Sequence, residues 1–496
     1  MTGSAVAPLK GWARAGWLAA ATGAGLTVGL LATRIATPKL ALVAVIGLLG
    51  AAAIAAIPEL GLLALAFAAY LNLSGVLADR LPGPSLMDLL IPFLALVVLA
   101  RWFVWRERPT GWLQPALLLT AYGVAGALSL LAAEYPSITL ASLASLAKDG
   151  IIAVLVGILL RRGVTLRRVL WALLAAGLIM GTISVHQHLT GNFGSDYWGF
   201  ANAPIPYSAP AQTVYRVAGP VGNPNYYGLI LVALVPIAFD RLAAKRSLAS
   251  RTLALWVLVA CSLSIVFTYS RGAFLALLAV LVLLWFFRRP RPRHLLAAVV
   301  LAALLLPFVP SSYVVRMQTL IGALGGTGSH VGLSDSSLRG RLSENLAAVR
   351  MFLEHPWIGI GLGNYPTRYQ DYSQQLLLDP RPENRSPHSL YLEIAAETGV
   401  IGLLAFGGVL WAVLSSILRA SRSARIPQLT ELRGMVVAVA LALVGFLAGS
   451  LFLHASNARY LWLLVGVALA LPRVAANERE ALGAAAGDVG LLPRNS

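Results

Sequence analysis

One histidine of this chain lies where a basic side chain can act at a membrane surface. His388 stands in the stretch Pro387-His388-Ser389-Leu390-Tyr391-Leu392-Glu393, between a long polar segment and the apolar run Val400 to Leu418. That run is long enough to enter a bilayer. Histidine has the side-chain pKa closest to neutrality, so it can take up and release protons where most groups cannot. His388 is therefore a candidate base for a substrate held at the membrane, and a packing role is the alternative.

An anion-binding pattern precedes another apolar run. Arg216 is followed by a Gly/Pro turn that ends at Asn223-Pro224-Asn225. Asn223 is suited to cap a helix and Pro224 to occupy its first position, and the free amide groups at a helix start favour an anion. Arginine binds phosphate oxygens through two parallel hydrogen bonds. The alternative is a stop-and-start signal whose arginine extends to the membrane surface.

A second arginine lies between two apolar runs with almost no loop, in the stretch Tyr269-Ser270-Arg271-Gly272-Ala273. An arginine at the bilayer centre costs ~2.5–3.5 kcal/mol on the insertion scale, so such residues usually face a cavity or a partner. Extension of the side chain to the interface is the alternative. Metal-ligand patterns such as His-Glu-x-x-His do not occur in the chain, so we expect neither a metal nor a cofactor.

The elements that carry these residues are predicted to be membrane helices. The 496 residues are 58% hydrophobic and only 12% charged, whereas roughly a quarter of a soluble protein is charged. Apolar runs of about 17–25 residues predict an all-α polytopic bundle of about twelve to fourteen spans. They begin near Gly16, Leu40, Leu60, Met87, Trp112, Thr139, Val169, Tyr226, Leu253, Ala273, Leu295, Ser389, Gly434 and Tyr460.

The net charge of +18 indicates membrane topology, and we expect no nucleic-acid partner. Five short loops hold 19 Lys/Arg and 3 Asp/Glu, and short basic loops are typically cytoplasmic. These loops are Arg101–Arg108, Arg161–Arg168, Asp240–Arg251, Arg288–Arg293 and Arg419–Arg433. With both termini inside, three segments fall on the outer face: Gly191–Gly222, the turn at Ser270-Arg271, and Ser311–Pro387, a large loop with 7 basic and 6 acidic residues.

Four parts follow from this topology. Residues 1–310 form transmembrane helices with the outer loop 191–222, residues 311–387 a large loop on the outer face, residues 388–474 the C-terminal helices, and residues 475–496 a disordered cytoplasmic tail. Within the large loop, Ser336 or Ser337 is expected to cap a helix that runs through Glu354. A Gly-rich turn at Gly359, Gly361 and Gly363 is expected to follow it.

Four motifs in order resemble those of the O-antigen ligase / O-antigen polymerase superfamily, which are bacterial inner-membrane glycosyltransferases with a large periplasmic loop. The motifs are Arg216 with Asn223-Pro224-Asn225, then Ser270-Arg271-Gly272-Ala273, then His355-Pro356 with Gly359 to Gly363, and finally His388 with Ala396-Glu397-Thr398-Gly399 and Gly402. The resemblance covers about Gly191 to Val409. One departure is Ser389, where the family often has asparagine.

The resemblance implies transfer of a glycan from an undecaprenyl-diphosphate carrier to an acceptor glycolipid, without a metal. Arg216 and Arg271 would stabilise the negative charge of the diphosphate leaving group. His388 would accept the proton of the acceptor hydroxyl. Arg339 and Tyr391 are weaker candidates for substrate binding, and Tyr391 for orienting the base. The implied location is the bacterial inner membrane, among membrane lipids, with the active site of a multi-pass protein facing the periplasm.

The motifs leave the acceptor open. A ligase would use a lipid A-core sugar, a polymerase a second carrier-linked repeat, and a related branch a protein serine; ligase is the first choice and polymerase the second. A transporter of lipid-linked sugars is the alternative from another class. A transporter would be expected to show internal symmetry and broken helices near the bilayer midplane, and the sequence indicates neither.

Overall fold

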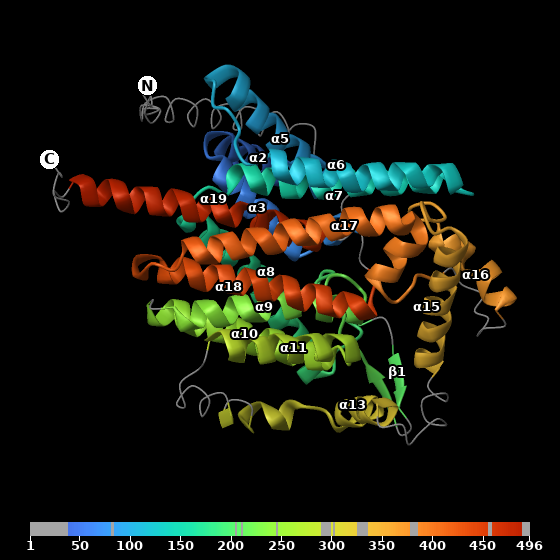
Figure 1. Cartoon of the computed structure of the whole chain (residues 1–496). Coiled ribbons are helices and arrows are strands. Elements are labelled where there is room, and N and C mark those ends of the chain that lie inside the picture. The colour runs from blue at the N-terminus through green and yellow to red at the C-terminus, as the bar shows by residue number, and fades with distance from the viewer. Residues whose placement is uncertain are drawn as a thin grey trace.

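The chain is a bundle of long apolar helices. The computed structural model describes residues 38–80, 84–203, 206–209, 212–244, 247–288, 299–300, 303–324, 336–376, 385–454 and 459–488. Within this part of the chain, ten helices are long and apolar enough to cross a membrane. Figure 1 shows most of them lying side by side along one direction. The expected all-α polytopic fold is confirmed, and the chain is a multi-pass membrane protein.

The ten long helices coincide with ten of the spans that the sequence predicts. They are α5 (Leu86–Trp105), α6 (Leu113–Leu128), α7 (Pro136–Leu159), α8 (Gly163–Thr190), α9 (Pro224–Ala243), α10 (Leu248–Phe267), α11 (Arg271–Arg288), α17 (Leu390–Ser423), α18 (Thr430–Gly449) and α19 (Arg459–Asp488). Shorter helices precede them: α2 (Pro38–Ala56), α3 (Pro58–Tyr70) and α4 (Leu73–Ala78). The spans expected to begin near Gly16 and Leu295 start outside the described residues.

Short elements gather at one end of the bundle, which we call the loop end (Figure 1). They are α15 (Ser336–Glu354), α16 (Tyr365–Gln375) and an antiparallel hairpin of β1 (Pro206–Ala209) and β2 (Gln212–Tyr215). The helix α15 ends at Glu354, as the sequence predicts, and begins at Ser336, one of the two serines expected to cap it. The hairpin was not predicted from the sequence. The opposite end carries the basic loop between α17 and α18, and we call it the basic end.

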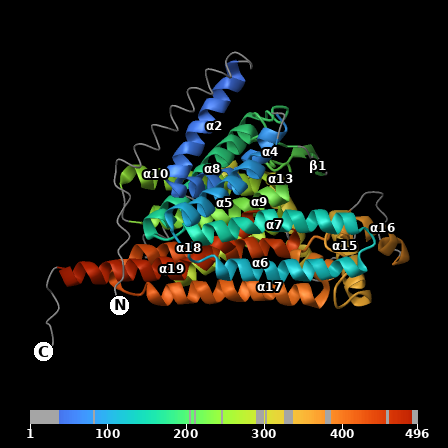
Figure 2. The same ribbon diagram turned by 90° about the horizontal axis from the view of Figure 1, so that it is seen from above.

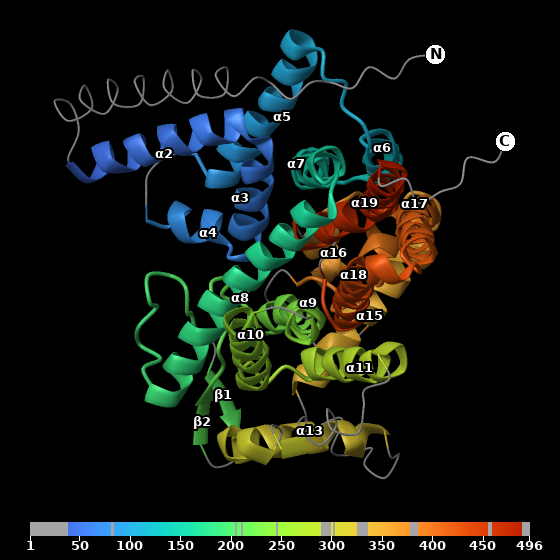
Figure 3. The same cartoon turned by 90° about the vertical axis from the view of Figure 1, so that its left-hand side faces the viewer.

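The helix α9 lies at the centre of one half of the bundle. Seen from the basic end, it is surrounded by α8, α10, α11 and α18 (Figure 3). Every residue of α9 from Tyr227 to Ala238 is buried, which is typical of a helix that is apolar on all sides. Gly228 allows close contact, because a Cβ at that position would lie 2.7 Å from the Cβ of Ala273 on α11. The start of α9 is thereby held against the start of α11.

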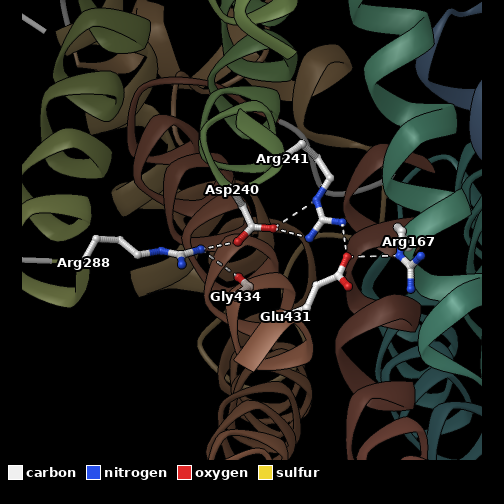
Figure 4. A network of polar contacts seen from close by, with 6 residues as sticks. All are labelled: Arg167, Asp240, Arg241, Arg288, Glu431 and Gly434. Carbon is white, nitrogen blue, oxygen red and sulfur yellow. Dashed lines mark hydrogen bonds and ion pairs between the residues drawn. The ribbon is translucent and has the colours of Figure 1, made fainter. Parts of the chain in front are cut away.

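A charge network joins four helices at the basic end (Figure 4). The carboxylate of Asp240 on α9 accepts hydrogen bonds from the adjacent Arg241, at 2.5 and 3.1 Å, and from Arg288 at the end of α11. Arg241 also lies 3.1 Å from Glu431 of α18, which in turn pairs with Arg167 of α8 at 3.1 Å. The side chains of Asp240 and Arg241 are buried. The network therefore fixes the ends of these helices relative to one another.

Removal of the Asp240 carboxylate is expected to destabilise the bundle. In Asp240→Ala the buried guanidinium of Arg241 loses its closest counter-charge, and breaking a buried pair typically costs about 3–5 kcal/mol. Thermal unfolding of the purified protein in detergent measures the change. Asp196→Asn is the matched control, because its carboxylate is 52% exposed beside Arg80 and such pairs contribute about 0–1 kcal/mol. Equal melting temperatures for the two variants would contradict the assignment.

The C-terminal helix extends further than the sequence analysis predicts. The helix α19 continues to Asp488, so residues 475–488 are helical where a disordered tail was expected, and residues 489–496 lie outside the described part. Ala, Glu and Arg are frequent there and are strong helix formers. The helix is also anchored, because Glu478 accepts a hydrogen bond from the backbone N–H of Gly163 at 2.8 Å. This expectation is therefore corrected for residues 475–488.

Candidate functional site

A histidine and a carboxylate meet at the loop end. The Nδ1 atom of His388 lies 2.5 Å from Oε2 of Glu344, a residue of α15. The Glu344 side chain is 2% exposed, whereas that of His388 is 21% exposed. A negative charge this close to Nδ1 favours a proton on that nitrogen rather than on Nε2, although the contact lacks the geometry of a hydrogen bond. The pair thus has the arrangement of an oriented general base.

The first turn of α17 holds His388 in place. Ser389 caps this helix, since its hydroxyl accepts a hydrogen bond from the backbone N–H of Leu392 at 3.5 Å. The Tyr391 hydroxyl donates to the carbonyl of Leu447 on α18 at 3.0 Å. Among the described residues, Glu344 pairs with the imidazole, whereas the Tyr391 hydroxyl is directed to Leu447. Substrate binding by Tyr391 stays a prediction, as does binding by Arg339, which is exposed near the start of α15.

The Gly-rich turn docks onto a break in α17. Gly359, Gly361 and Gly363 adopt φ angles of 69°, 106° and 80°, which residues other than glycine rarely adopt. A Cβ at Gly359 would overlap the backbone of Glu397, and Gly399 interrupts the helical φ/ψ of α17 at that level. The three glycines therefore form the turn that the sequence predicts. Figure 2 shows α17 running from α15 at the loop end along the whole bundle.

A small separate core positions Glu344. It joins α15 and α16 to the first turns of α17, and its buried residues are Ala347, Ala348, Met351, Ile360, Tyr365, Tyr369, Tyr372 and Ala396. The Tyr365 hydroxyl donates to the backbone carbonyl of Glu344 at 2.5 Å. The backbone N–H of Tyr365 in turn donates to the Glu397 carboxylate of α17 at 3.3 Å. The carboxylate that faces His388 is thus carried by a packed unit.

Arg216 is buried directly after strand β2. Its Nε donates to the carbonyl of Thr268 at 2.8 Å, and its Nη2 donates to the side-chain oxygen of Asn225 at 2.7 Å. Asn223 caps α9 by accepting hydrogen bonds from the next two backbone N–H groups, and Pro224 is the first helical residue. The predicted cap is confirmed. Arg216 therefore links the start of α9 to the turn that precedes α11.

Arg271 is the first residue of α11 and is also buried. The turn before it places Tyr269 at a φ of 52°, in the left-handed region that costs a residue with a Cβ about 1 kcal/mol or more. The Tyr269 hydroxyl bonds to that of Ser312 at 3.1 Å, at the start of α13 (Ser311–Leu324). Ser270 accepts a hydrogen bond from the backbone N–H of Ala273 at 3.3 Å. These contacts fix the direction in which Arg271 leaves the turn.

The two arginine segments and the histidine segment are connected at the loop end. A Cβ at Gly272 would lie 2.9 Å from the Cβ of Phe452, which precedes His454 by two positions. The ring of His454 lies 6.3 Å from that of His388, centroid to centroid, at an interplanar angle of 80°. Arg216 contacts Thr268 of the turn that precedes Arg271. Packing therefore links the segments that carry the three residues singled out from the sequence, through Phe452 and His454.

Glu344 and His454 were missed by the sequence analysis. Glu344 is one of several acidic residues in the large loop, and His454 follows α18 without a surrounding motif. Burial, together with the positive charge of His388 when that residue is protonated, lowers the pKa of His454 to about 4. The ring is therefore neutral at physiological pH. It can pack against the imidazole of His388 without adding charge.

The stability of the protein should fall on acidification because of His454. Its pKa is about 4 in the folded protein and about 6.5 in the unfolded chain, so the folded state favours the neutral ring. This contribution is fully present above pH 6.5 and is lost as the pH falls toward 4, by up to about 3 kcal/mol. Melting temperatures measured from pH 7.5 to 4 should decline less steeply for His454→Gln. A slope equal to that of the wild type would contradict this assignment.

The fold and the site define a class: a multi-pass helical membrane protein whose loop end joins a His–Glu pair to two buried arginines. Residues 256–407 match the family model described as O-antigen ligase. The match begins in α10 and ends in α17, so it includes Arg271, Glu344 and His388 but not Arg216.

This match supports membership of the chain in the O-antigen ligase superfamily, which the sequence motifs resemble, and it confirms that recognition. It also supports a function in lipid-linked glycan transfer or polymerisation, carried out by a glycosyltransferase-like enzyme. No curated protein matches the chain.

Proposed function

We propose that the chain transfers a glycan from undecaprenyl diphosphate to a sugar hydroxyl of a lipid A-core acceptor, as an O-antigen ligase does. The observation that carries the proposal is the contact of 2.5 Å between His388 and the buried Glu344, at the end of the bundle that also holds Arg216 and Arg271. An oriented base at the same end of the bundle as two guanidinium groups suits a reaction in which a hydroxyl loses a proton and a diphosphate departs.

The proposed step is a single displacement at the anomeric carbon of the donor sugar. Nε2 of His388 takes the proton of the acceptor hydroxyl while its oxygen forms the new glycosidic bond. The bond between the anomeric carbon and the phosphate oxygen breaks, and the diphosphate leaves with the electron pair. Arg216 and Arg271 offset the charge that develops on it. The carboxylate of Glu344 stabilises the imidazolium until the proton passes to solvent.

We assign the site to the periplasmic face of the bacterial inner membrane. The basic loop between α17 and α18 lies at the end of the bundle opposite the His388 segment (Figure 1), and short basic loops are retained in the cytoplasm. The large loop is close to neutral and can cross the membrane. This placement gives the site access to carrier-linked glycans in the outer leaflet.

Reconstitution tests the proposal. The purified protein is incubated with undecaprenyl-diphosphate-linked glycan and either lipid A-core or a second carrier-linked repeat, and both product and released undecaprenyl diphosphate are measured. We expect product with lipid A-core and no loss of rate in EDTA, since arginines replace a metal in this scheme. Product only with the second repeat would indicate a polymerase. Absence of carrier release with every acceptor would refute glycan transfer and leave a transporter as the alternative.

A further inference from the structure

A groove lined by α7 and by the start of α19 is separate from the His388 site. Its volume is about 470 Å³. Six residues of α7 between Ile138 and Asp149 line it, together with Arg459. Its polar groups are Ser142, Ser145, Lys148, Asp149 and Arg459. None of these residues takes part in the chemistry proposed above.

The polar residues form one stripe on a helix that can cross a membrane. Ser142, Ser145 and Asp149 are three or four positions apart, so they share one face of α7. Lys148 lies beside this face and pairs with Asp88 of α5 at 2.9 Å. Charged and hydroxyl groups within an apolar span are costly and usually mark a path or a binding site.

Two atoms in the groove lack a hydrogen-bond partner among the described residues. One is Oδ1 of Asp149, whose side chain is buried, and the other is Nη1 of Arg459. Asp149 offers an acceptor and Arg459 a donor. Buried polar groups are normally satisfied, so unpaired groups that line a cavity indicate a ligand that both donates and accepts.

The groove lies close to the proposed active site. A Cβ at Gly363 would overlap the hydroxyl of Ser142, so the Gly-rich turn packs directly against one residue that lines the groove. At the other end, Tyr460 follows Arg459 and packs edge-on against Tyr226 of α9, with ring centroids 5.7 Å apart. Tyr226 directly follows Asn225, the partner of Arg216. The lining of the groove therefore touches the turn that docks on α17, and Arg459 directly precedes a residue that packs on the start of α9.

We propose that this groove binds a saccharide unit of a substrate, an inference that rests on the proposed glycan transfer. Sugar hydroxyls can donate to Asp149 and accept from Arg459, and the hydroxyls of Ser142 and Ser145 can bond to further sugar oxygens. A simple anion would leave the Asp149 carboxylate unpaired and would be repelled by it. A lipid chain would satisfy neither group. The saccharide belongs either to the carrier-linked donor or to the acceptor.

Binding measurements on the full-length protein in lipid nanodiscs test the inference. Ser145→Ala and Asp149→Asn are compared with Ser137→Ala, an exposed serine of α7 outside the groove. All variants carry His388→Ala, so that affinity is measured without turnover. The probes are undecaprenyl-diphosphate-linked oligosaccharide, undecaprenyl diphosphate alone, and soluble core oligosaccharide of lipopolysaccharide.

We expect Asp149→Asn to weaken binding of one oligosaccharide probe by about tenfold or more, as for loss of a hydrogen bond to a charged group. Ser145→Ala should weaken binding of the same probe by about threefold or more, as for loss of a hydrogen bond between neutral groups. Weakening with the carrier-linked probe alone assigns the groove to the donor, and weakening with the core oligosaccharide alone assigns it to the acceptor. Binding of undecaprenyl diphosphate and all binding by Ser137→Ala should not change.

Unchanged affinity for both oligosaccharides, or an equal loss for undecaprenyl diphosphate itself, overturns the inference. Ser145 is exposed, so its truncation leaves the fold intact even if Asp149→Asn proves unstable. Binding and transfer are separate measurements. If the wild type transfers glycan to no acceptor while the groove variants lose oligosaccharide affinity, the proposed function fails and the saccharide groove stands.

Discussion

His388→Ala is expected to lower the rate of glycan transfer by about 10²–10⁴-fold, the usual contribution of a positioned general base. The loss should appear in kcat, because the acceptor hydroxyl then lacks a group to take its proton. Affinity for carrier-linked glycan should be retained, since the imidazole is not assigned to diphosphate binding. Glu344→Gln should also lower kcat, because a neutral amide does not favour the form of His388 in which Nε2 is free to accept a proton.

The matched control is His186→Ala. His186 is exposed on α8 and contacts the Tyr197 hydroxyl at 3.2 Å, outside the His388 site. Its loss should change kcat little. Single-turnover transfer and donor binding are measured side by side for each variant. Undiminished transfer by His388→Ala would contradict the role of a base, and a variant that cannot be purified in folded form would favour a structural role.

Arg271→Ala is expected to lower kcat by about 10²–10³-fold, the effect of removing one preorganised donor that stabilises developing charge. Arg271 is the first residue of α11, and the backbone amide groups at a helix N-terminus also favour negative charge. Arg271→Lys should recover only part of the loss, because lysine keeps the charge but not the paired hydrogen bonds. Release of undecaprenyl diphosphate per unit time measures the effect directly.

Arg251→Ala serves as the control for that substitution. Arg251 is exposed near the start of α10, next to the basic end of the bundle, and should leave kcat unchanged. Arg216→Ala should resemble Arg271→Ala but also destabilise the turn, since it frees the Thr268 carbonyl and the Asn225 side chain. If Arg271→Ala retained full kcat, the role assigned to this residue in stabilising the charge of the leaving group would be wrong.

The helices were predictable because each rests on interactions within its own segment. In a bilayer the backbone must satisfy its hydrogen bonds internally, so a long apolar run is a helix whatever its neighbours are. The Asn223-Pro224 cap and the helix from Ser336 to Glu354 follow local rules in the same way. The helical extension of α19 was not predicted, because the composition of this segment indicates disorder and does not reveal the contact between Glu478 and Gly163 that anchors it.

The amino-acid sequence by itself determined the membrane class, the order of spans, the superfamily and the choice of Arg216, Arg271 and His388 as candidates. Only the tertiary structure paired His388 with Glu344, placed His454 beside it and exposed the groove at Asp149 and Arg459. The reason is physical. Secondary structure depends on neighbours within a few residues, whereas a site forms where helices distant in sequence pack, and that packing has no local signature.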